Sequence, residues 1–314
     1  MLNILIVGCG NIGKRHLFSL NNSKHKINIK VLEKDIKKIK LFKKINKGFT
    51  GYIKNYSEID RNTALLLICT KAYKREKIIK SVLKYCNPKF MILEKIPFQK
   101  MTAYREILNL CKKRKIKTWV NFPFRYQSYY KFLKKIIFKN NKFFSMIVLL
   151  SKSDDLFSSG IHFFDLFLHK IEKDLKIEYM EVLKKNNDYN GTYTGRFVFS
   201  SKNRTIAVLN SKSKFQQQMH IFGSYHNLKI NFFSNKGDPW KNPKVNIYKK
   251  NKNIGNFKHL WQSQLTSLYL KDIKLKGKCL LPTLQESYKC NDLIIDAFKK
   301  KLKVYLKNSL CPIT

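Results

Sequence analysis

Acidic side chains are scarce in this sequence: 20 of its 314 residues are Asp or Glu, against 64 Lys and Arg, which gives a net charge of +44. Such an excess of basic residues is common in proteins that bind nucleic acid or an anionic membrane. Here, however, only 8 of the basic residues are Arg, and the lysines are spread along the whole chain rather than gathered in one arm. We therefore interpret the charge as a solvated surface that attracts anionic ligands, and expect no specific nucleic-acid partner.

Long apolar runs and paired cysteines are also missing. The longest aliphatic runs, 64–69 and 146–150, are far shorter than the ~20 residues that cross a bilayer, and they fit buried strands. The seven cysteines include no C-x-x-C pair, which argues against a disulfide framework or a cysteine-based zinc site. The first residues, MLNILIVGCG, contain no basic leader. We expect a cytoplasmic protein with no membrane partner.

Glycine is sparse as well, with 12 residues in the chain, yet three of them stand close together near the start. An apolar, strand-like run over 2–8 leads into GCGNIG (8–13), and a helix-like stretch follows. A strand, a G-x-G-x-x-G turn and a helix in this order are the context of a dinucleotide-binding site. Gly8 permits the turn, Gly10 lets the main chain approach a pyrophosphate, and Gly13 lets the helix pack on the strand.

The start of the helix and the next strand offer the other cofactor contacts. The N–H groups of Asn11 and Ile12, at the helix N-terminus, are placed to bind phosphate oxygens. The second strand, 27–35, contains Glu33. An acid at this distance from the glycines binds the adenosine ribose and favours NAD over NADP. Two readings stay open: Glu33 could instead pair with a nearby lysine, and Lys34 could accommodate the phosphate of NADP.

Strand-like and helix-like stretches continue to alternate through the first 120 residues. Apolar runs at 64–70, 89–95 and 116–122 are separated by stretches with apolar side chains at helical spacing. This alternation predicts an α/β fold with a doubly wound parallel sheet. Ligands of such sheets bind beyond the carboxyl ends of the strands. The candidate residues at those ends are Thr70, Glu94, Lys95 and Asn121.

Five stretches, taken in order, resemble the Gfo/Idh/MocA family of nicotinamide-dependent oxidoreductases: GCGNIGKRH, ICTKAYKRE, LEKIPF, VNFPFRYQ and SSGIHFFDL. The resemblance covers essentially the whole chain. It implies a Rossmann domain over 1–121, followed by an α+β domain over 122–314 that binds substrate. The second domain would hold an open, mostly antiparallel sheet, and its exposed face would pair with another subunit in a homodimer or homotetramer.

The third stretch resembles the E-K-P motif of the family, in which the lysine acts on the substrate hydroxyl beside the nicotinamide. The matching residues are Glu94 and Lys95, although Ile96 separates them from the proline, Pro97. The resemblance therefore implies that Lys95 is the principal catalytic base or hydrogen-bond donor. It also implies that Glu94 and Lys95 lie beside the cofactor.

Two other stretches carry further candidates. ICTKAYKRE is similar to a family pattern T-P-x-x-x-H, with Thr70 as a cofactor neighbour, Lys71 in place of the proline and Arg75 in place of the histidine. VNFPFRYQ places Asn121 and Arg125 just after the last Rossmann strand. We expect both to bind substrate, with the alternative for Arg125 that it ties the domains together.

The stretch SSGIHFFDL resembles the family pattern D-x-G-x-H-x-x-D at Gly160, His162 and Asp165, but Ser158 stands where the first aspartate would be. The resemblance implies that His162 is catalytic, and that Ser158 and Asp165 contact substrate. Two alternatives for His162 stay open: a hydrogen-bonded core histidine, or a metal ligand grouped with Asp165 and His169. We expect no metal.

The expected function is hydride transfer between NAD and a secondary alcohol or ketone of a sugar or nucleotide-sugar. Surface-polysaccharide biosynthesis is the setting suggested by analogy with similar family members. Two alternatives use the same fold. One is an NAD(P)-binding regulator without catalysis, which the missing aspartate would suit. The other is an enzyme that resembles biliverdin reductase and acts on a substrate other than a sugar.

Overall fold

The chain forms two compact units, each of which we describe by itself. The computed structural model describes residues 1–35, 37–40, 51–140, 144–151, 154–157, 159–167, 176–186, 192–210, 217–224, 226–232, 243–288, 291–292 and 294–295. The chain leaves the first unit after Pro123 and returns to it at Trp261. The predicted boundary at residue 121 lies close to this passage. Residues 261–292, however, which the prediction placed in the second domain, group with the first unit.

The first unit is built on a six-stranded sheet in which every strand pair is parallel. Its strand order is β3-β2-β1-β4-β5-β6, which is the order of a dinucleotide-binding Rossmann fold. The order reverses between β1 and β4, so a crevice for ligands is expected beyond the carboxyl ends of these two strands. The strands are β1 (Leu2–Val7), β2 (Ile27–Leu32), β3 (Gly51–Ile53), β4 (Leu65–Ile68), β5 (Phe90–Glu94) and β6 (Lys117–Asn121).

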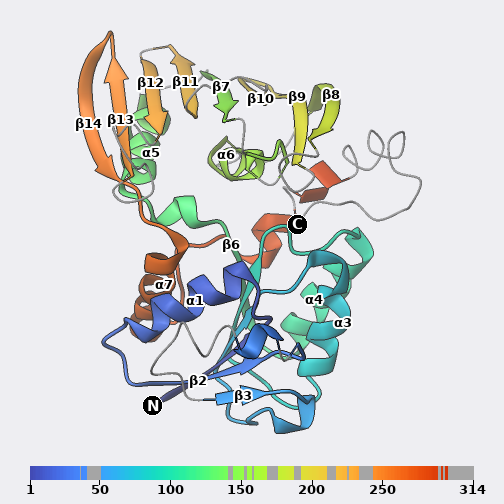
Figure 1. Ribbon diagram of the computed structural model, residues 1–314. Coiled ribbons are helices and arrows are strands. Elements are labelled where there is room, and N and C mark those ends of the chain that lie inside the picture. Colours follow the sequence, from blue (N-terminus) through green and yellow to red (C-terminus); the bar gives the residue numbers. More distant parts are fainter. Residues whose placement is uncertain are drawn as a thin grey trace. The chain divides into compact units, whose positions relative to one another are not determined.

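Helices cover both faces of this sheet (Figure 1). On one face, α1 (Asn11–Asn21) packs against α7 (Gln262–Lys276), a helix contributed by the distant part of the chain. The other face carries α3 (Ala72–Val82) and α4 (Met101–Lys113). Because both faces are covered, the central strands are apolar on both sides, and all four residues of β4 are buried. A short 3₁₀ helix, η1 (Tyr56–Glu58), precedes β4.

The second unit contains an eight-stranded mixed sheet in the order β14-β13-β12-β11-β7-β10-β9-β8. Its neighbouring strands pair antiparallel, except that β7 and β10 run parallel. This confirms the expected open, mostly antiparallel sheet. The strands are β7 (Phe144–Leu150), β8 (Lys176–Asn186), β9 (Thr192–Ser201), β10 (Arg204–Asn210), β11 (Gln218–Gly223), β12 (Asn227–Phe232), β13 (Lys244–Lys249) and β14 (Lys252–Lys258).

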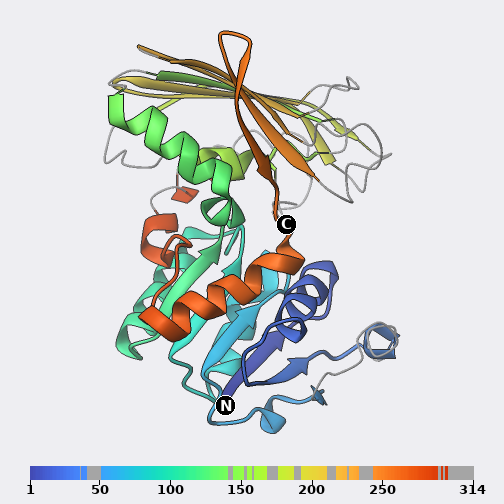
Figure 2. The same cartoon turned by 90° about the vertical axis from the view of Figure 1, so that its left-hand side faces the viewer.

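One face of this sheet is covered by α5 (Ser128–Asn140) and α6 (Gly160–Phe167), as Figure 2 shows. Alternating residues of the strands, such as Met146, Val148 and Ile206, are buried against this helical layer. The opposite face carries no helix among the described residues. The short 3₁₀ helix η2 (Pro123–Tyr126) precedes α5.

None of the described helices is long and apolar enough to cross a membrane.

Candidate functional site

The glycine turn between β1 and α1 has the geometry that its sequence predicts. Gly8 has a φ of +96°, a left-handed conformation that favours glycine. A Cβ on Gly13 would lie 2.1 Å from the carbonyl oxygen of Gly8, so helix and strand can approach this closely only without a side chain. A Cβ on Gly10 would meet nothing within 4 Å, which means that the space in front of this residue is open.

The N-terminus of α1 fits a phosphate group. No side chain caps it, since the N-cap residue is Gly10. Its first turn contains no acidic residue, so nothing competes there for the N–H groups of Asn11 and Ile12 or opposes the positive end of the helix dipole. The open space at Gly10 leaves room for a pyrophosphate, and the uncapped N–H groups of the helix supply the hydrogen-bond donors that it requires.

Glu33 lies beside the same turn, just after β2. Its Oε2 accepts a hydrogen bond of 2.8 Å from the N–H of Cys9, the residue between the first two glycines. Its Oε1 accepts from the N–H groups of Lys34 and Asp35 at 2.9 and 3.1 Å. These bonds fix the carboxylate next to the turn, where an acid would contact the adenosine ribose.

Thr70 lies across from the turn, two residues after β4. Its Cγ2 is 3.0 Å from the position that a Cβ on Gly8 would take, so the two residues are in contact. The Oγ1 of Thr70 is buried and has no hydrogen-bond partner among the described residues. A buried hydroxyl of this kind is costly unless something bonds to it, and a bound cofactor at this edge of the sheet would supply a partner.

Glu94, the last residue of β5, is buried and turned into the protein. Its Oε1 bonds to His16 Nε2 and to Asn121 Nδ2, each at 2.7 Å. Burial raises the pKa of the Glu94 carboxyl, but the hydrogen bond and charge of His16, with help from Asn121 and Arg75, outweigh that effect and hold the pKa below its usual value. The carboxylate is therefore ionised and committed to internal partners.

Asn121 is equally committed, because α7 supplies its remaining partners. Its Nδ2 also donates to Gln262 Oε1 at 2.9 Å, and its Oδ1 accepts from the hydroxyl of Tyr269 at 3.1 Å. The network continues from His16 Nδ1 to Thr266 Oγ1 at 2.8 Å. The expected substrate contact of Asn121 and cofactor contact of Glu94 therefore stay predictions, while the structure gives their side chains a role in joining α1, β5, β6 and α7.

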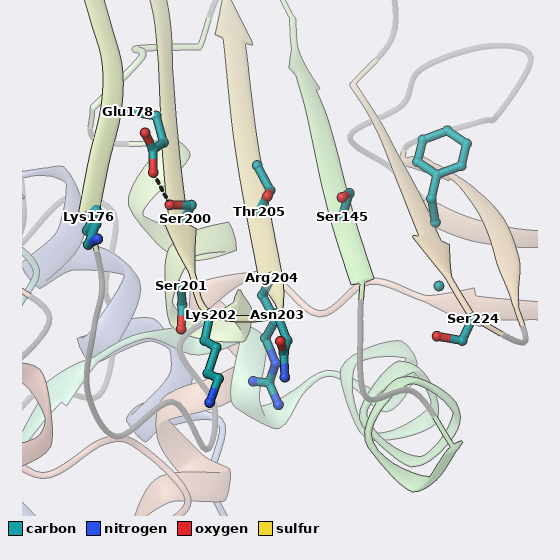
Figure 3. A pocket seen from close by; sticks show the side chains of 12 residues that line it. Ser145, Lys176, Glu178, Ser200, Ser201, Lys202, Asn203, Arg204, Thr205 and Ser224 are labelled. Carbon is teal, nitrogen blue, oxygen red and sulfur yellow. Dashed lines mark hydrogen bonds between the residues drawn. The ribbon is translucent and has the colours of Figure 1, made fainter.

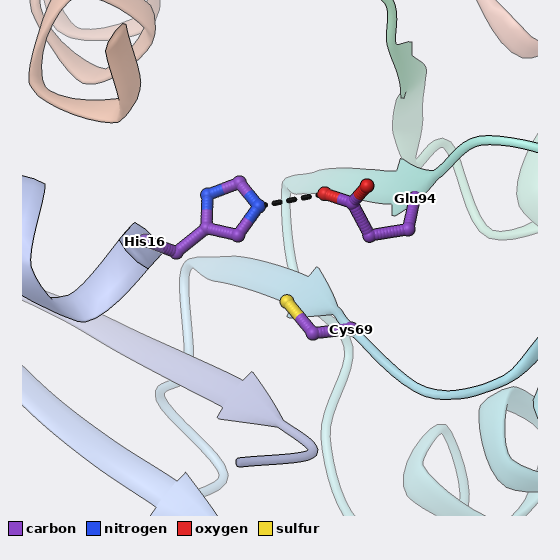
Figure 4. Close-up of side chains that lie close together, drawn as sticks. All are labelled: His16, Cys69 and Glu94. Carbon is purple, nitrogen blue, oxygen red and sulfur yellow. Dashed lines mark hydrogen bonds and ion pairs between the residues drawn. The ribbon is translucent and has the colours of Figure 1, made fainter. Parts of the chain in front are cut away.

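His16, Cys69 and Glu94 lie within 4.8 Å of one another and contain atoms that could hold a metal ion (Figure 4). Hydrogen bonds, however, already occupy both ring nitrogens of His16. Burial raises the pKa of the Cys69 thiol well above its usual value, which disfavours the thiolate that a metal requires. The arrangement is that of a buried hydrogen-bonded pair with a neighbouring thiol.

Lys95 follows Glu94 immediately beyond the end of β5 and is half-buried. The main chain around it is bound by Arg75, a fully buried side chain of α3. Sequence reasoning noted Arg75 only as a departure from the family pattern and did not single out His16. The signals were present: each is a polar residue inside one of the five stretches.

The candidates of the second unit lie near α6. The ring of His162 stacks on Phe124, with 5.1 Å between centroids and 25° between planes. Arg125 and Asp165 form a two-bond ion pair, with Nε and Nη2 each 2.8 Å from a carboxylate oxygen. The pair joins the two side chains to each other, and their expected substrate contacts stay predictions. Ser158, and His169 of the metal alternative, lie outside the described residues.

A hollow of about 820 Å³ lies elsewhere in the second unit, on the face of the sheet opposite the helices (Figure 3). Its walls are mostly hydroxyl, amide and basic side chains, among them Ser145, Ser200 and Arg204, and Glu178 and Phe222 also line it. None of the predicted site residues lines it. We therefore do not assign the reaction to this hollow.

Comparison with known proteins gives a family match for the first part of the chain. Residues 2–122 match the model of an oxidoreductase family with an NAD-binding Rossmann fold, GFO_IDH_MocA. This part of the chain is similar to the Gfo/Idh/MocA family. No curated protein sequence matches the chain significantly. The match confirms the resemblance for the stretches that lie within residues 2–122, and with it an NAD-binding oxidoreductase domain.

Solved structures extend the likeness in fold beyond the part matched by the Gfo/Idh/MocA family. An oxidoreductase from Agrobacterium radiobacter, in complex with NAD⁺, L-tartaric acid and magnesium, is 14% identical with a TM-score of 0.71, covering 97% of each chain. The 3-ketoreductase KijD10 from Actinomadura kijaniata, in complex with NADP, is 14% identical with a TM-score of 0.68, covering 94% of this chain and 96% of its own. The putative oxidoreductase YvaA from Bacillus subtilis is 13% identical with a TM-score of 0.72, covering 97% and 98%. At these identities the likeness concerns the fold, and it includes both units.

Proposed function

We propose that the protein transfers hydride between NAD and a secondary alcohol or ketone of a sugar or nucleotide-sugar. The observation that carries this proposal is the turn at Gly8, Gly10 and Gly13, which combines an open approach at its second glycine with an uncapped helix N-terminus. Glu33 beside the turn and the unpartnered hydroxyl of Thr70 support the same reading. The helix N–H groups, the Glu33 carboxylate and the Thr70 hydroxyl are all polar groups to which a bound dinucleotide could form hydrogen bonds.

We assign the proton transfer to Lys95 and a supporting role to His162. When bound, the nicotinamide supplies the site that accepts or returns hydride. The amine of Lys95 would remove the proton from the substrate hydroxyl, or return it in the reverse direction. His162 would help to orient the substrate or exchange protons with it. The stacking of its ring on Phe124 supports this role, because it fixes the plane of the imidazole.

The substrate class is supported by what similar proteins were crystallised with. KijD10 is a 3-ketoreductase, and one of its variants was crystallised with TDP-benzene and NADP. A nucleoside diphosphate sugar is anionic, and the net charge of +44 would attract such a ligand. Surface-polysaccharide biosynthesis is the setting in which such a substrate would be expected. A panel of sugars and nucleotide-sugars, scored by the absorbance of NADH, tests the proposal.

The coenzyme preference of this site can be tested at Glu33. Replacing Glu33 by Ala is expected to weaken NADH binding by about 10- to 150-fold, because a charged hydrogen bond contributes about 1.5–3 kcal/mol. NADPH binding should be unchanged or stronger, since its ribose phosphate no longer meets a carboxylate. Titrating the quenching of protein fluorescence with each coenzyme measures both affinities.

Asp35→Ala is the matched control for this experiment. Asp35 is also an acid just beyond β2, but its carboxylate accepts from the N–H of Lys37 rather than from the glycine turn. This variant should bind NADH as the wild type does. Equal losses in both variants would mean that charge in general, and not the place of Glu33, governs coenzyme binding. A wild-type protein that binds neither coenzyme would refute the proposed function.

We also propose that the exposed face of the eight-stranded sheet forms a homodimer or homotetramer contact. Apolar side chains lie half-exposed on the face that carries no described helix: Ile147 and Leu149 of β7, Ala207 and Leu209 of β10, and Val198 of β9. The strand register aligns Ile147 with Ala207 and Leu149 with Leu209. A contiguous apolar face of this kind commonly marks a protein contact.

Leu209→Lys tests this contact. A charge in the centre of the apolar face is expected to shift the mass in solution toward the 37.3 kDa of one chain, because an unpaired charge is costly in an interface. Light scattering after size-exclusion chromatography measures that mass. Leu275→Lys is the control, since Leu275 is 70% exposed on α7 in the first unit. A wild-type protein that is monomeric would contradict the proposal.

A further inference from the structure

Arg75 is the most deeply buried charged side chain near the proposed catalytic lysine. It is 1% exposed, on α3. Its guanidinium contacts main-chain carbonyl oxygens: Nη1 donates to those of Glu94 and Ile96, each at 2.6 Å, and to that of Pro97 at 2.8 Å. Nη2 donates to the carbonyl of Thr70. One side chain thus binds the ends of two neighbouring strands.

These contacts fix the main chain on both sides of one residue. The carbonyls of Glu94 and Ile96 converge on a single nitrogen, and Lys95 is the residue between them. Residues 94–97 therefore curl around the guanidinium. The same guanidinium binds the carbonyl of Thr70, which follows the neighbouring strand β4. A change in the position of this guanidinium would move the main chain of Lys95 directly.

The choice of arginine has a physical reason. Burying a cation is unfavourable unless polar groups surround it, and here carbonyl oxygens do so. Burial lowers the pKa of Arg75 to about 10, an effect that the charge of Glu94 opposes, so the group remains cationic at neutral pH. The planar fork lets Nη1 bind the carbonyls beyond β5 while Nη2 reaches the carbonyl of Thr70, whereas a lysine ammonium offers its donors from one point.

Two departures from the family pattern meet at this contact. The pattern has a histidine where this chain has Arg75, and a proline directly after the lysine, where this chain has Ile96. The carbonyl of the inserted Ile96 is one of the oxygens that the guanidinium binds.

We propose that Arg75 is a positioning residue that fixes the loop of Lys95 and thereby sets the reactivity of the Lys95 amine. The inference rests on the proposed function only in taking Lys95 as the reacting group. Arg75→Lys tests it, since this variant keeps the charge and removes the fork. The readout is the rate at which acetic anhydride labels Lys95, measured by mass spectrometry of peptides across a range of pH.

The expected result is a labelling rate of Lys95 that rises at least about threefold in Arg75→Lys, because a loop released from its hydrogen bonds exposes its side chains more often. Lys117, an exposed lysine of the same unit that donates to the carbonyl of Gly277, serves as the internal reference. A general loosening of the protein would raise both rates, whereas loss of positioning raises that of Lys95 alone.

Arg114→Lys is the matched control variant. Arg114 also donates to a main-chain carbonyl, that of Leu83, but far along the chain from the Lys95 loop. It should leave the labelling rate of Lys95 unchanged. If Arg75→Lys does not fold, Arg75→His takes its place, since the family pattern has a histidine at this position. A folded variant in which the labelling of Lys95 changes less than threefold overturns the inference.

The proposed function and this inference can fail separately. NADH binding by the wild type is measured in the same samples. Absence of binding would count against the proposed function, whereas the labelling contrast between Lys95 and Lys117 does not require the coenzyme. Retained NADH binding with unchanged labelling in Arg75→Lys would count against the role of Arg75 alone.

Discussion

Lys95→Met is expected to lower turnover by about 10²–10⁴-fold, the range that a positioned acid or base contributes. Methionine keeps an unbranched apolar chain of similar length, so the half-buried stem of the side chain can still pack while the amine is lost. NADH binding should stay close to that of the wild type, because the coenzyme contacts proposed for Gly10, Glu33 and Thr70 are intact. Turnover is measured with the sugar or nucleotide-sugar that the wild type converts best.

Lys100→Met is the control for this experiment. Lys100 is an exposed lysine five positions further along the same loop, at the N-cap of α4. It should convert substrate as the wild type does. A Lys95→Met variant that keeps more than about a tenth of the activity would remove Lys95 from the mechanism. A wild type that binds NADH and converts no member of the panel would instead favour the regulator without catalysis.

The first sheet could be predicted from the sequence because its signals are local. Five of its six strands are short apolar runs followed by a helical pattern, and Gly8 and Gly13 stand where the turn requires them. The sixth, β3, has three residues and was not predicted. Parallel pairing follows from this alternation, because a helix between two strands returns the chain to the same end of the sheet. The family match to residues 2–122 agrees with this reading.

The network around Glu94 could not be predicted in the same way. Position at the carboxyl end of a strand places a residue at the edge of the sheet, but it does not say whether the side chain points to the ligand or to the interior. The partners that decide this come from far along the chain: His16 bonds to Thr266, and Asn121 bonds to Gln262. Nothing in the local pattern of residues 261–276 indicates that this helix packs on α1.

Glu94→Gln is expected to destabilise the protein by about 1.5–3 kcal/mol at neutral pH, because a neutral amide replaces the ionised carboxylate that makes charge-assisted hydrogen bonds to His16 and Asn121. Glutamine has nearly the same size, so the loss would not come from a cavity. Chemical denaturation followed by circular dichroism measures the free energy of unfolding. The main-chain amides of α7 should also exchange their hydrogens faster, because the network joins α7 to β5 through Asn121.

Glu106→Gln provides the matched comparison. Glu106 is also paired with a basic side chain, that of Lys80, but on the surface, where water screens the charges. The exposed pair should contribute little to the free energy of unfolding. Similar losses in Glu94→Gln and Glu106→Gln would show that burial does not strengthen the pair formed by Glu94 and His16.

The pH dependence of unfolding separates charge from hydrogen bonding at Glu94. The pKa of its carboxyl is lower in the folded protein than its ordinary value of 4.5. Its contribution to stability is therefore complete above pH 4.5 and is lost as the pH falls through the lower folded value. The difference in unfolding free energy between wild type and Glu94→Gln should shrink as the pH is lowered in that range. A difference that stays constant would mean that the carboxylate stabilises the fold by its shape and hydrogen bonds alone, and that its charge has no part in holding α1, β5 and α7 together.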